Sequence, residues 1–173
     1  MDTSSSTPLP ESQLYFCTPT ALIRQKFLYP ICLGHFFCDS TYHVERSSYD
    51  SFLLLYVRSG SGYLKYSGKK SHLTEGDFCC IDCYHPHIYG TNANWEIQWI
   101  HFDGISAGSY YQWITRQHGY VFRLTKGQTL KILRPLQHML DIFSTHVPIM
   151  KFGFPNTLQI CFPSFLVCPI IHF

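Results

Sequence analysis

Between residues 28 and 103, apolar positions recur in short runs that end at glycine-containing turns. The runs with the residues of strands are 52–57, 63–67, 78–82 and 95–102. The turns expected beside them are 59–62, a hairpin turn, 68–70 and 75–77. Short strands separated by turns every eight to twelve residues or so predict a β-sandwich or a β-barrel.

The last run, 95–102, has one aromatic face. Because neighbouring side chains of a strand point to opposite sides, its odd-numbered positions share a face. These positions are Trp95, Ile97, Trp99 and His101. We expect this face to point into the barrel, with Glu96 and Gln98 on the other side.

After residue 104 the spacing of apolar residues changes to three and four, which is typical of helices. The first expected helix face holds Tyr110, Trp113 and Ile114, and the second holds Leu130, Leu133, Leu136, Leu140 and Phe143. The fold class predicted from the pattern is therefore mainly β with C-terminal helices. It comprises a barrel at 21–104 and a helical segment at 105–146.

Both ends of the chain depart from this pattern. Residues 1–20 are rich in Ser, Thr and Pro and lack periodicity, so we expect a flexible arm. The segment 147–173 contains prolines and many phenylalanines, a composition that argues against a continuous helix and against a membrane span. A reading frame shifted from Met150 permits an amphipathic helix instead. We hypothesise that this tail is the out-of-frame ending of a truncated product.

Composition narrows the classes of function. With 173 residues, of which 46% are apolar and 14% charged, the chain is expected to form one domain with a real core. The net charge is +2, and no basic run exceeds Lys69-Lys70, so we expect no nucleic-acid binding by this chain. The N-terminus lacks the apolar core of a secretory signal, so a cytoplasmic location with reduced thiols is expected.

The eight cysteines and ten histidines raise the question of a metal. Cys80 and Cys83 have the spacing of a zinc knuckle, but there is only one such pair and it falls on a strand. We therefore expect no metal and interpret the thiols as small core residues. No nucleophile triad and no phosphate-binding loop are visible, so the chain is predicted to be no enzyme and to hold no cofactor.

Four residues are candidates for ligand binding. Arg46 sits in a strand-like segment, 42–46. Facing into a small barrel, it would need a partner such as a polyol or carboxylate ligand, and facing outward it would pair with Glu45 or Asp50. Tyr89 and Trp99 offer aromatic faces for stacking a sugar, with core packing as the alternative. His87 is a hydrogen-bonding pocket residue, a rim residue or a plain structural residue.

The stretch from 46 to 104 resembles the N-terminal regulatory domain of AraC-family transcription regulators. The motifs that carry the resemblance are Tyr-Val-Arg-Ser-Gly-Ser-Gly at 56–62, Leu-Thr-Glu-Gly-Asp at 73–77, Tyr-His-Pro-His-Ile-Tyr at 84–89 and Trp-Glu-Ile-Gln-Trp-Ile-His-Phe-Asp-Gly at 95–104. Over residues 28–146, the resemblance implies a cupin-like (jelly-roll) barrel that binds a small effector, often a sugar. It also implies helices that form a homodimer, and a DNA-binding half that is missing here.

The resemblance also implies where the effector binds. The pocket positions of the family hold Arg46, Tyr89 and Trp99 here, whereas a polar position between the two tryptophans is Ile97. In some members the N-terminal arm closes over the ligand. These features predict an effector-sensing and dimerisation domain of a transcription regulator.

Two alternatives remain open. The first is a metal-dependent cupin enzyme, such as an isomerase or a dioxygenase, because Gly76 and His87 have the spacing of the second metal-ligand motif of cupins. No His follows His43, and no Glu follows Glu45, before the Gly60 turn, and one remaining ligand does not hold a metal. The second alternative is a non-functional truncated fragment.

Overall fold

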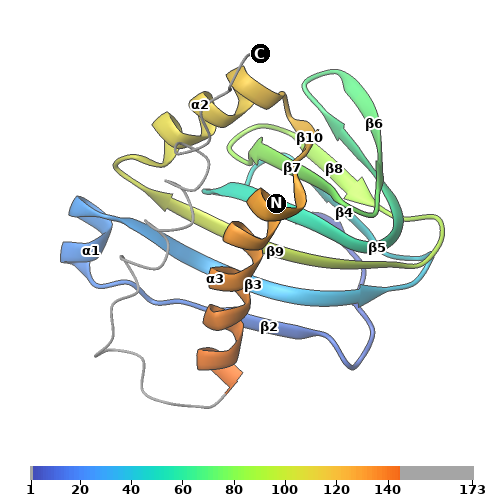
Figure 1. Cartoon of the computed structure of the whole chain (residues 1–173), viewed down its shortest axis with the longest axis horizontal. Coiled ribbons are helices and arrows are strands. Elements are labelled where there is room, and N and C mark those ends of the chain that lie inside the picture. Colours follow the sequence, from blue (N-terminus) through green and yellow to red (C-terminus); the bar gives the residue numbers. More distant parts are fainter. Residues whose placement is uncertain (1, 145–173) are drawn as a thin grey trace.

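The computed structural model describes residues 2–144 (Figure 1). The strands in this range are β1 (Asp2–Ser5), β2 (Gln13–Phe16), β3 (Leu28–Cys38), β4 (His43–Arg46), β5 (Phe52–Tyr66), β6 (Lys69–Thr74), β7 (Asp77–Asp82), β8 (His87–Gly90), β9 (Trp95–Gly104) and β10 (Val121–Arg123). The helices are α1 (Ala21–Lys26), α2 (Ala107–His118) and α3 (Lys126–Ser144). The tail hypothesised at 147–173 lies outside the described residues.

The strands form one antiparallel, jelly-roll-like sheet in the order β1-β4-β8-β5-β9-β3-β2, with β6 and β7 also paired to β5 and β10 paired to β7. This order is open in the described part of the chain. The jelly-roll-like, mainly β architecture with helices at its C-terminal end confirms the predicted fold class. The long strand β5 connects the two halves of the sheet. Its first part pairs with β7 and β9, and its second part pairs with β6 and β8.

The prediction of a hairpin turn at 59–62 is wrong, because β5 continues through these residues. The register with β9 shifts between Val57 and Ser59, which marks an irregularity in the ladder where the strand changes partners. Gly60 has a φ of 76°, and a Cβ at this position would meet the backbone oxygen of Asn94. The glycines therefore permit a bend in a continuous strand rather than a reversal of the chain.

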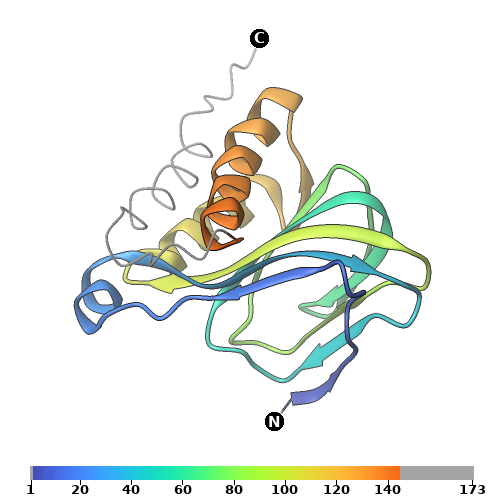
Figure 2. The ribbon, with the colours of Figure 1, turned by 90° about the horizontal axis from the view of Figure 1, so that it is seen from below.

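The segment predicted as an arm without periodicity contains two strands. Strand β1 pairs with β4 at one edge of the sheet, and β2 pairs with β3 at the other. Between them, the Leu9 amide donates to the carbonyl of Phe37 at 2.8 Å. Figure 2 shows this segment running beside β3 before it bends toward the N-terminus. The segment is thus paired with the sheet along much of its length.

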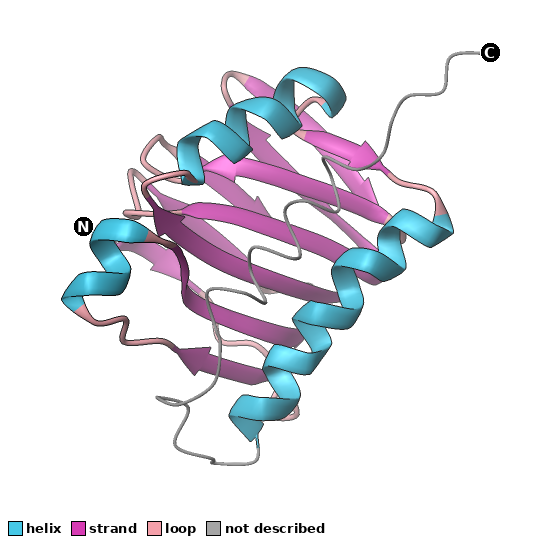
Figure 3. Cartoon of the chain, turned by 60° about the vertical axis from the view of Figure 1, so that its left-hand side comes forward, coloured by secondary structure: helices cyan, strands magenta, loops and turns pink. Residues whose placement is uncertain are grey.

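Two clusters of buried side chains form the core. One lies between the sheet and the helices, which cover one face of the strands in Figure 3. The other lies inside the fold, and Trp95, Ile97 and Trp99 belong to it, which confirms the inward face expected for 95–102. Gln98 points the opposite way, toward α3, and its amide nitrogen donates to Gln137 at 2.8 Å.

The helices were predicted with a partly wrong face. Ile114 of α2 is buried as expected, whereas Leu130 of α3 is 40% exposed. The buried residues of α3 are Ile132, Leu136, Met139 and Leu140. Leu133 and Phe143 also pack against the cluster between the sheet and the helices, so the predicted face is wrong at Leu130 alone, and Ile132 and Met139 extend it. Among the described residues, no helix has both the length and the apolar character needed to cross a membrane.

The cysteines that attracted a zinc interpretation are core residues. Cys79, Cys80 and Cys83 are each at most 1% exposed. Burial raises the pKa of the Cys79 thiol to about 12, so this side chain stays protonated and apolar at neutral pH. Within residues 2–144 no three His, Cys, Asp or Glu side chains are grouped as a metal ion requires.

Candidate ligand-binding site

A cavity of about 250 Å³ lies between the inner face of the sheet and the N-terminal segment. Its described lining consists of Ser6, Pro8, Leu9, Ser12, Leu14, Phe16, Cys32, Phe36, Tyr42, Val44, Arg46, Tyr49, Tyr89, Trp99 and His101. Three of the four candidates from the sequence therefore meet in one place: Arg46, Tyr89 and Trp99. The volume is below the roughly 300–1,000 Å³ of pockets for drug-sized ligands, so the cavity suits a smaller molecule.

Arg46 is the last residue of β4, and it lines the cavity. Its guanidinium carbon lies 4.6 Å from the ring centroid of Tyr49, which is the distance of a cation–π contact. The Tyr49 ring in turn meets His101 edge-on, with 4.8 Å between the ring centroids. Aromatic rings therefore hold the guanidinium at the cavity wall. Glu45, the neighbour on β4, has a half-exposed side chain.

Trp99 forms the floor of the cavity together with Phe36, whose ring meets it edge-on at 5.0 Å between centroids. The tryptophan is 8% exposed, and its indole Nε1 finds no hydrogen-bond partner among the described residues. A buried N–H group without a partner destabilises the protein, so a ligand that accepts a hydrogen bond from it would bind more tightly. Tyr89 is also buried, and this burial raises its pKa, so its hydroxyl remains protonated.

His101 belongs to the cavity wall, although no binding role was predicted for it. Its Nδ1 lies 2.8 Å from the hydroxyl of Ser51. Burial, with a smaller contribution from the Arg46 charge, lowers the pKa of His101 to about 3. The imidazole is thus neutral across the physiological range. Its place two residues after Trp99 on the inward face was the signal that indicated its position.

His87, the fourth candidate, is 1% exposed but does not line this cavity. Its Nδ1–H donates to the carbonyl of His85 at 2.8 Å, and burial lowers its pKa. In this neutral form Nε2 carries a lone pair, for which the described residues supply no donor. The His87 ring lies nearly parallel to that of Tyr89, with 6.3 Å between centroids. His87 therefore packs against the wall of the cavity.

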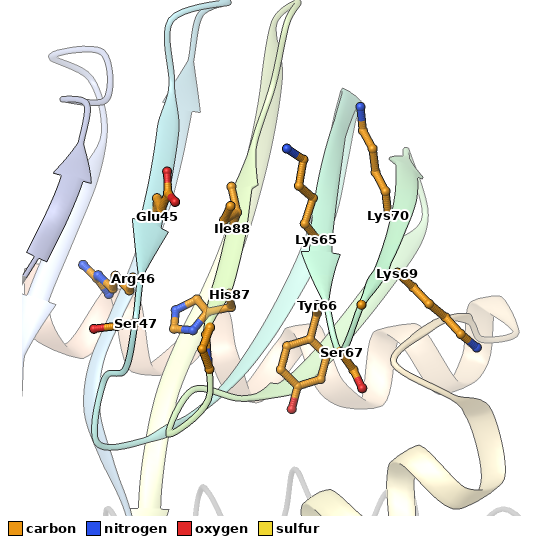
Figure 4. Close-up of a pocket in the computed structure, with 12 residues that line it drawn as sticks. Glu45, Arg46, Ser47, Lys65, Tyr66, Ser67, Lys69, Lys70, His87 and Ile88 are labelled. Atoms are coloured by element: carbon orange, nitrogen blue, oxygen red, sulfur yellow. The ribbon is translucent and has the colours of Figure 1, made fainter.

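A second, more open hollow of about 530 Å³ lies on the other side of Arg46. Its described lining is Glu45, Arg46, Ser47, Lys65, Tyr66, Ser67, Gly68, Lys69, Lys70, Pro86, His87 and Ile88. Figure 4 shows the His87 ring extending from β8 toward Arg46 and Ser47, while the lysines extend from the β5–β6 hairpin away from it. Arg46 therefore borders both hollows, and His87 borders this one.

Two serines fasten the N-terminal segment over the cavity. The Ser6 hydroxyl donates to the carbonyl of His43 at 3.2 Å and accepts from the His43 amide. Ser12 does the same with Phe37, donating to its carbonyl at 3.2 Å and accepting from its amide at 2.9 Å. Sequence reasoning missed both serines, because a Ser in a Ser/Thr-rich stretch carries no signal of its distant partner.

Gly34 on β3 makes room for the cavity floor. It pairs with Trp99 on β9, and a Cβ on Gly34 would lie 2.7 Å from Cζ2 of that indole and 2.8 Å from the backbone oxygen of Gln13. We expect Gly34→Ala to displace the indole and to lower the free energy of unfolding by about 1–3 kcal/mol. Urea unfolding followed by tryptophan fluorescence measures this loss.

Gly127→Ala is the matched control, because a Cβ there meets nothing within 4 Å and the residue lies in α3. This second variant is expected to keep or raise stability by up to about 1 kcal/mol, since alanine favours a helix. Equal unfolding midpoints for the two variants would contradict the role given to Gly34.

The domain is mainly β and jelly-roll-like, with helices at its C-terminal end and a small, partly open cavity beneath its N-terminal segment. The family model described as the AraC-like ligand binding domain matches residues 30–148, and the chain belongs to this family. Among curated proteins, none matches the chain.

Several solved structures are similar to this chain at low identity. A cupin superfamily protein from Desulfitobacterium hafniense is 10% identical, with 56% of this chain and 81% of that chain covered and a TM-score of 0.41. An HTH_3 family transcriptional regulator from Vibrio cholerae is 13% identical, with 54% and 52% covered and a TM-score of 0.43. A protein from Thermotoga maritima, titled a predicted oxalate decarboxylase, is 15% identical, with 52% and 78% covered and a TM-score of 0.41.

Proposed function

We propose that this domain is the effector-sensing and dimerisation part of an AraC-type transcription regulator, with a small polar effector bound in the cavity of about 250 Å³. The observation that carries the proposal is the meeting of Arg46, Tyr89 and Trp99 with the N-terminal segment around one partly open cavity. A cationic donor, an indole donor and aromatic faces at one site are the features with which proteins orient small polar ligands. A sugar is the effector class that the family resemblance favours.

The proposed output is a shift between states of the N-terminal segment. This segment supplies one wall of the cavity, so a ligand that contacts it favours the closed arrangement over any open one. In a complete regulator, helices α2 and α3 would form the dimer contact and pass the change to attached DNA-binding units. The proposed role is binding rather than catalysis, in the cytoplasm, without metal or cofactor, and without nucleic-acid contact by this domain itself.

Replacing Arg46 tests the site. We expect a thermal-shift screen over sugars and small carboxylates to yield ligands whose affinity falls at least about tenfold in Arg46→Ala, since a hydrogen bond to a charged group contributes roughly 1.5–3 kcal/mol. Isothermal titration calorimetry measures the affinity. Arg116→Ala, an exposed residue of α2, is the control and should bind like the original protein. Unchanged binding by Arg46→Ala would place the effector elsewhere.

A further inference from the structure

We propose that the effector of this cavity carries a carboxylate on a mainly apolar body, and that a neutral sugar is the poorer ligand. This inference rests on the proposed function and narrows the class of molecule that the cavity takes. It comes from counting, over the described lining, the groups that donate hydrogen bonds and the groups that accept them.

The cavity wall is rich in positive and donor character. Arg46 is its one formally charged residue within the described lining, and the wall contains no Asp, Glu, Asn or Gln. The indole N–H of Trp99 is buried beside it without an acceptor in the described chain. His101 is neutral, because burial lowers its pKa to about 3, so the charge of the wall stays at one unit at neutral pH. An anion with one charge complements this wall.

The described wall has no carboxylate or amide acceptor for the hydroxyl groups of a sugar. Its acceptors are hydroxyls and one imidazole, and several of them already have partners. The Tyr49 hydroxyl lies 3.7 Å from Cys32 Sγ, and His101 Nδ1 lies 2.8 Å from the Ser51 hydroxyl. The hydroxyls of Ser6 and Ser12 are already engaged in both directions with the backbone at His43 and Phe37. A sugar brings a donor on each of its hydroxyl groups, and each donor buried without an acceptor costs about 1–3 kcal/mol. A carboxylate brings acceptors alone, and its charge is opposite to that of the Arg46 guanidinium, the formally charged group of the described lining.

The rest of the wall is apolar. The N-terminal segment contributes Pro8, Leu9, Leu14 and Phe16, and the sheet contributes Phe36 and Val44. Apolar side chains around the body of a ligand favour a hydrocarbon over a ring of hydroxyls, because burying apolar area stabilises the complex and burying unpaired hydroxyls does not. The arrangement therefore fits a small molecule with one polar end and one apolar end.

Pairs of ligands with the same apolar body and a different polar end, a carboxylate or its neutral amide, test this inference. We would titrate the full chain with benzoate and with 3-methylbutanoate, each beside its own amide, and with the neutral pentoses D-ribose and D-xylose. Each carboxylate is expected to bind at least about tenfold more tightly than its amide, because a charge-assisted hydrogen bond is roughly twice as strong as a neutral one. Each carboxylate is also expected to bind more tightly than either pentose.

Variants assign the preference to the wall. Arg46→Gln keeps donors but removes the charge, and it should abolish the difference between acid and amide. Trp99→Phe keeps an aromatic ring but removes the N–H, and it should weaken both members of a pair. Arg116→Gln, at an exposed site, should change neither. Near-ultraviolet circular dichroism of each variant verifies that the aromatic core is intact.

The outcomes separate the inference from the function it rests on. A preference for the acids that disappears in Arg46→Gln supports the inference. Equal binding of acids and amides, a preference that persists in Arg46→Gln, or binding of the pentoses in place of the acids overturns it and leaves an effector-sensing domain. Failure of every one of these ligands, pentoses included, overturns the inference and contradicts the proposed function as well.

Discussion

Truncation of Phe102 to alanine is expected to lower the free energy of unfolding by about 3–5 kcal/mol. This residue lies on β9, is fully buried, and stacks on Phe52 with 5.7 Å between ring centroids. Phe52 in turn contacts Tyr111 of α2 at 5.2 Å between centroids. The substitution therefore removes buried apolar area and leaves a cavity between the sheet and α2. Because β9 is a central strand held by neighbours on both sides, its backbone cannot move in to fill this cavity.

Equilibrium denaturation in urea, followed by far-ultraviolet circular dichroism, measures this change. Phe16→Ala is the matched control, because Phe16 lies on the edge strand β2 and is 68% exposed. Its loss should cost no more than about 1 kcal/mol, since a mostly exposed ring has little contact to lose. A loss at Phe102 no greater than that at Phe16 would show that the cluster between sheet and helices does not carry the stability of the fold.

Much of the sheet was predictable, because apolar residues occur at every second position of a strand that has one buried face. The positions Trp95, Ile97 and Trp99 show it, and all three are buried in the inner cluster. The glycines of 59–62 misled the prediction, because a glycine with positive φ serves a tight turn and a bend within a strand equally well. The choice depends on whether distant strands lie beside the segment, which local sequence does not record.

The N-terminal segment shows the same limit more strongly. Strands β1 and β2 are each four residues long and take their pairing from β4 and β3, so their own residues carry no pattern. The cavity residues divide in the same way. Arg46, Tyr89 and Trp99 were identified from their charge and aromatic character and again from the family resemblance. Gly34 and the two serines, in contrast, act through contacts between segments far apart in the chain. Such contacts are properties of the folded structure.

Removal of both serine hydroxyls, in Ser6→Ala/Ser12→Ala, is expected to weaken effector binding by at least about tenfold. Together the two hydroxyls make four hydrogen bonds to the backbone of β4 and to that of β3. Each of these hydrogen bonds contributes roughly 0.5–1.5 kcal/mol, so the loss of all four lowers the free energy that favours the closed segment by about 2–6 kcal/mol. Because the segment forms one wall of the cavity, an open segment leaves the ligand exposed to water and lowers its affinity in proportion to the closed fraction.

Calorimetric titration with any ligand found in the thermal-shift screen measures the effect, and susceptibility to limited proteolysis within residues 6–16 reports opening of the segment independently. Ser109→Ala is the control, since this exposed hydroxyl lies on α2, far along the chain from the segment. Faster proteolysis with unchanged affinity would mean that the segment covers the cavity without taking part in binding. Affinity lost without faster proteolysis would assign the two hydroxyls to direct contact with the effector. Only lower affinity together with faster proteolysis shows that the two serines hold the segment closed over the cavity.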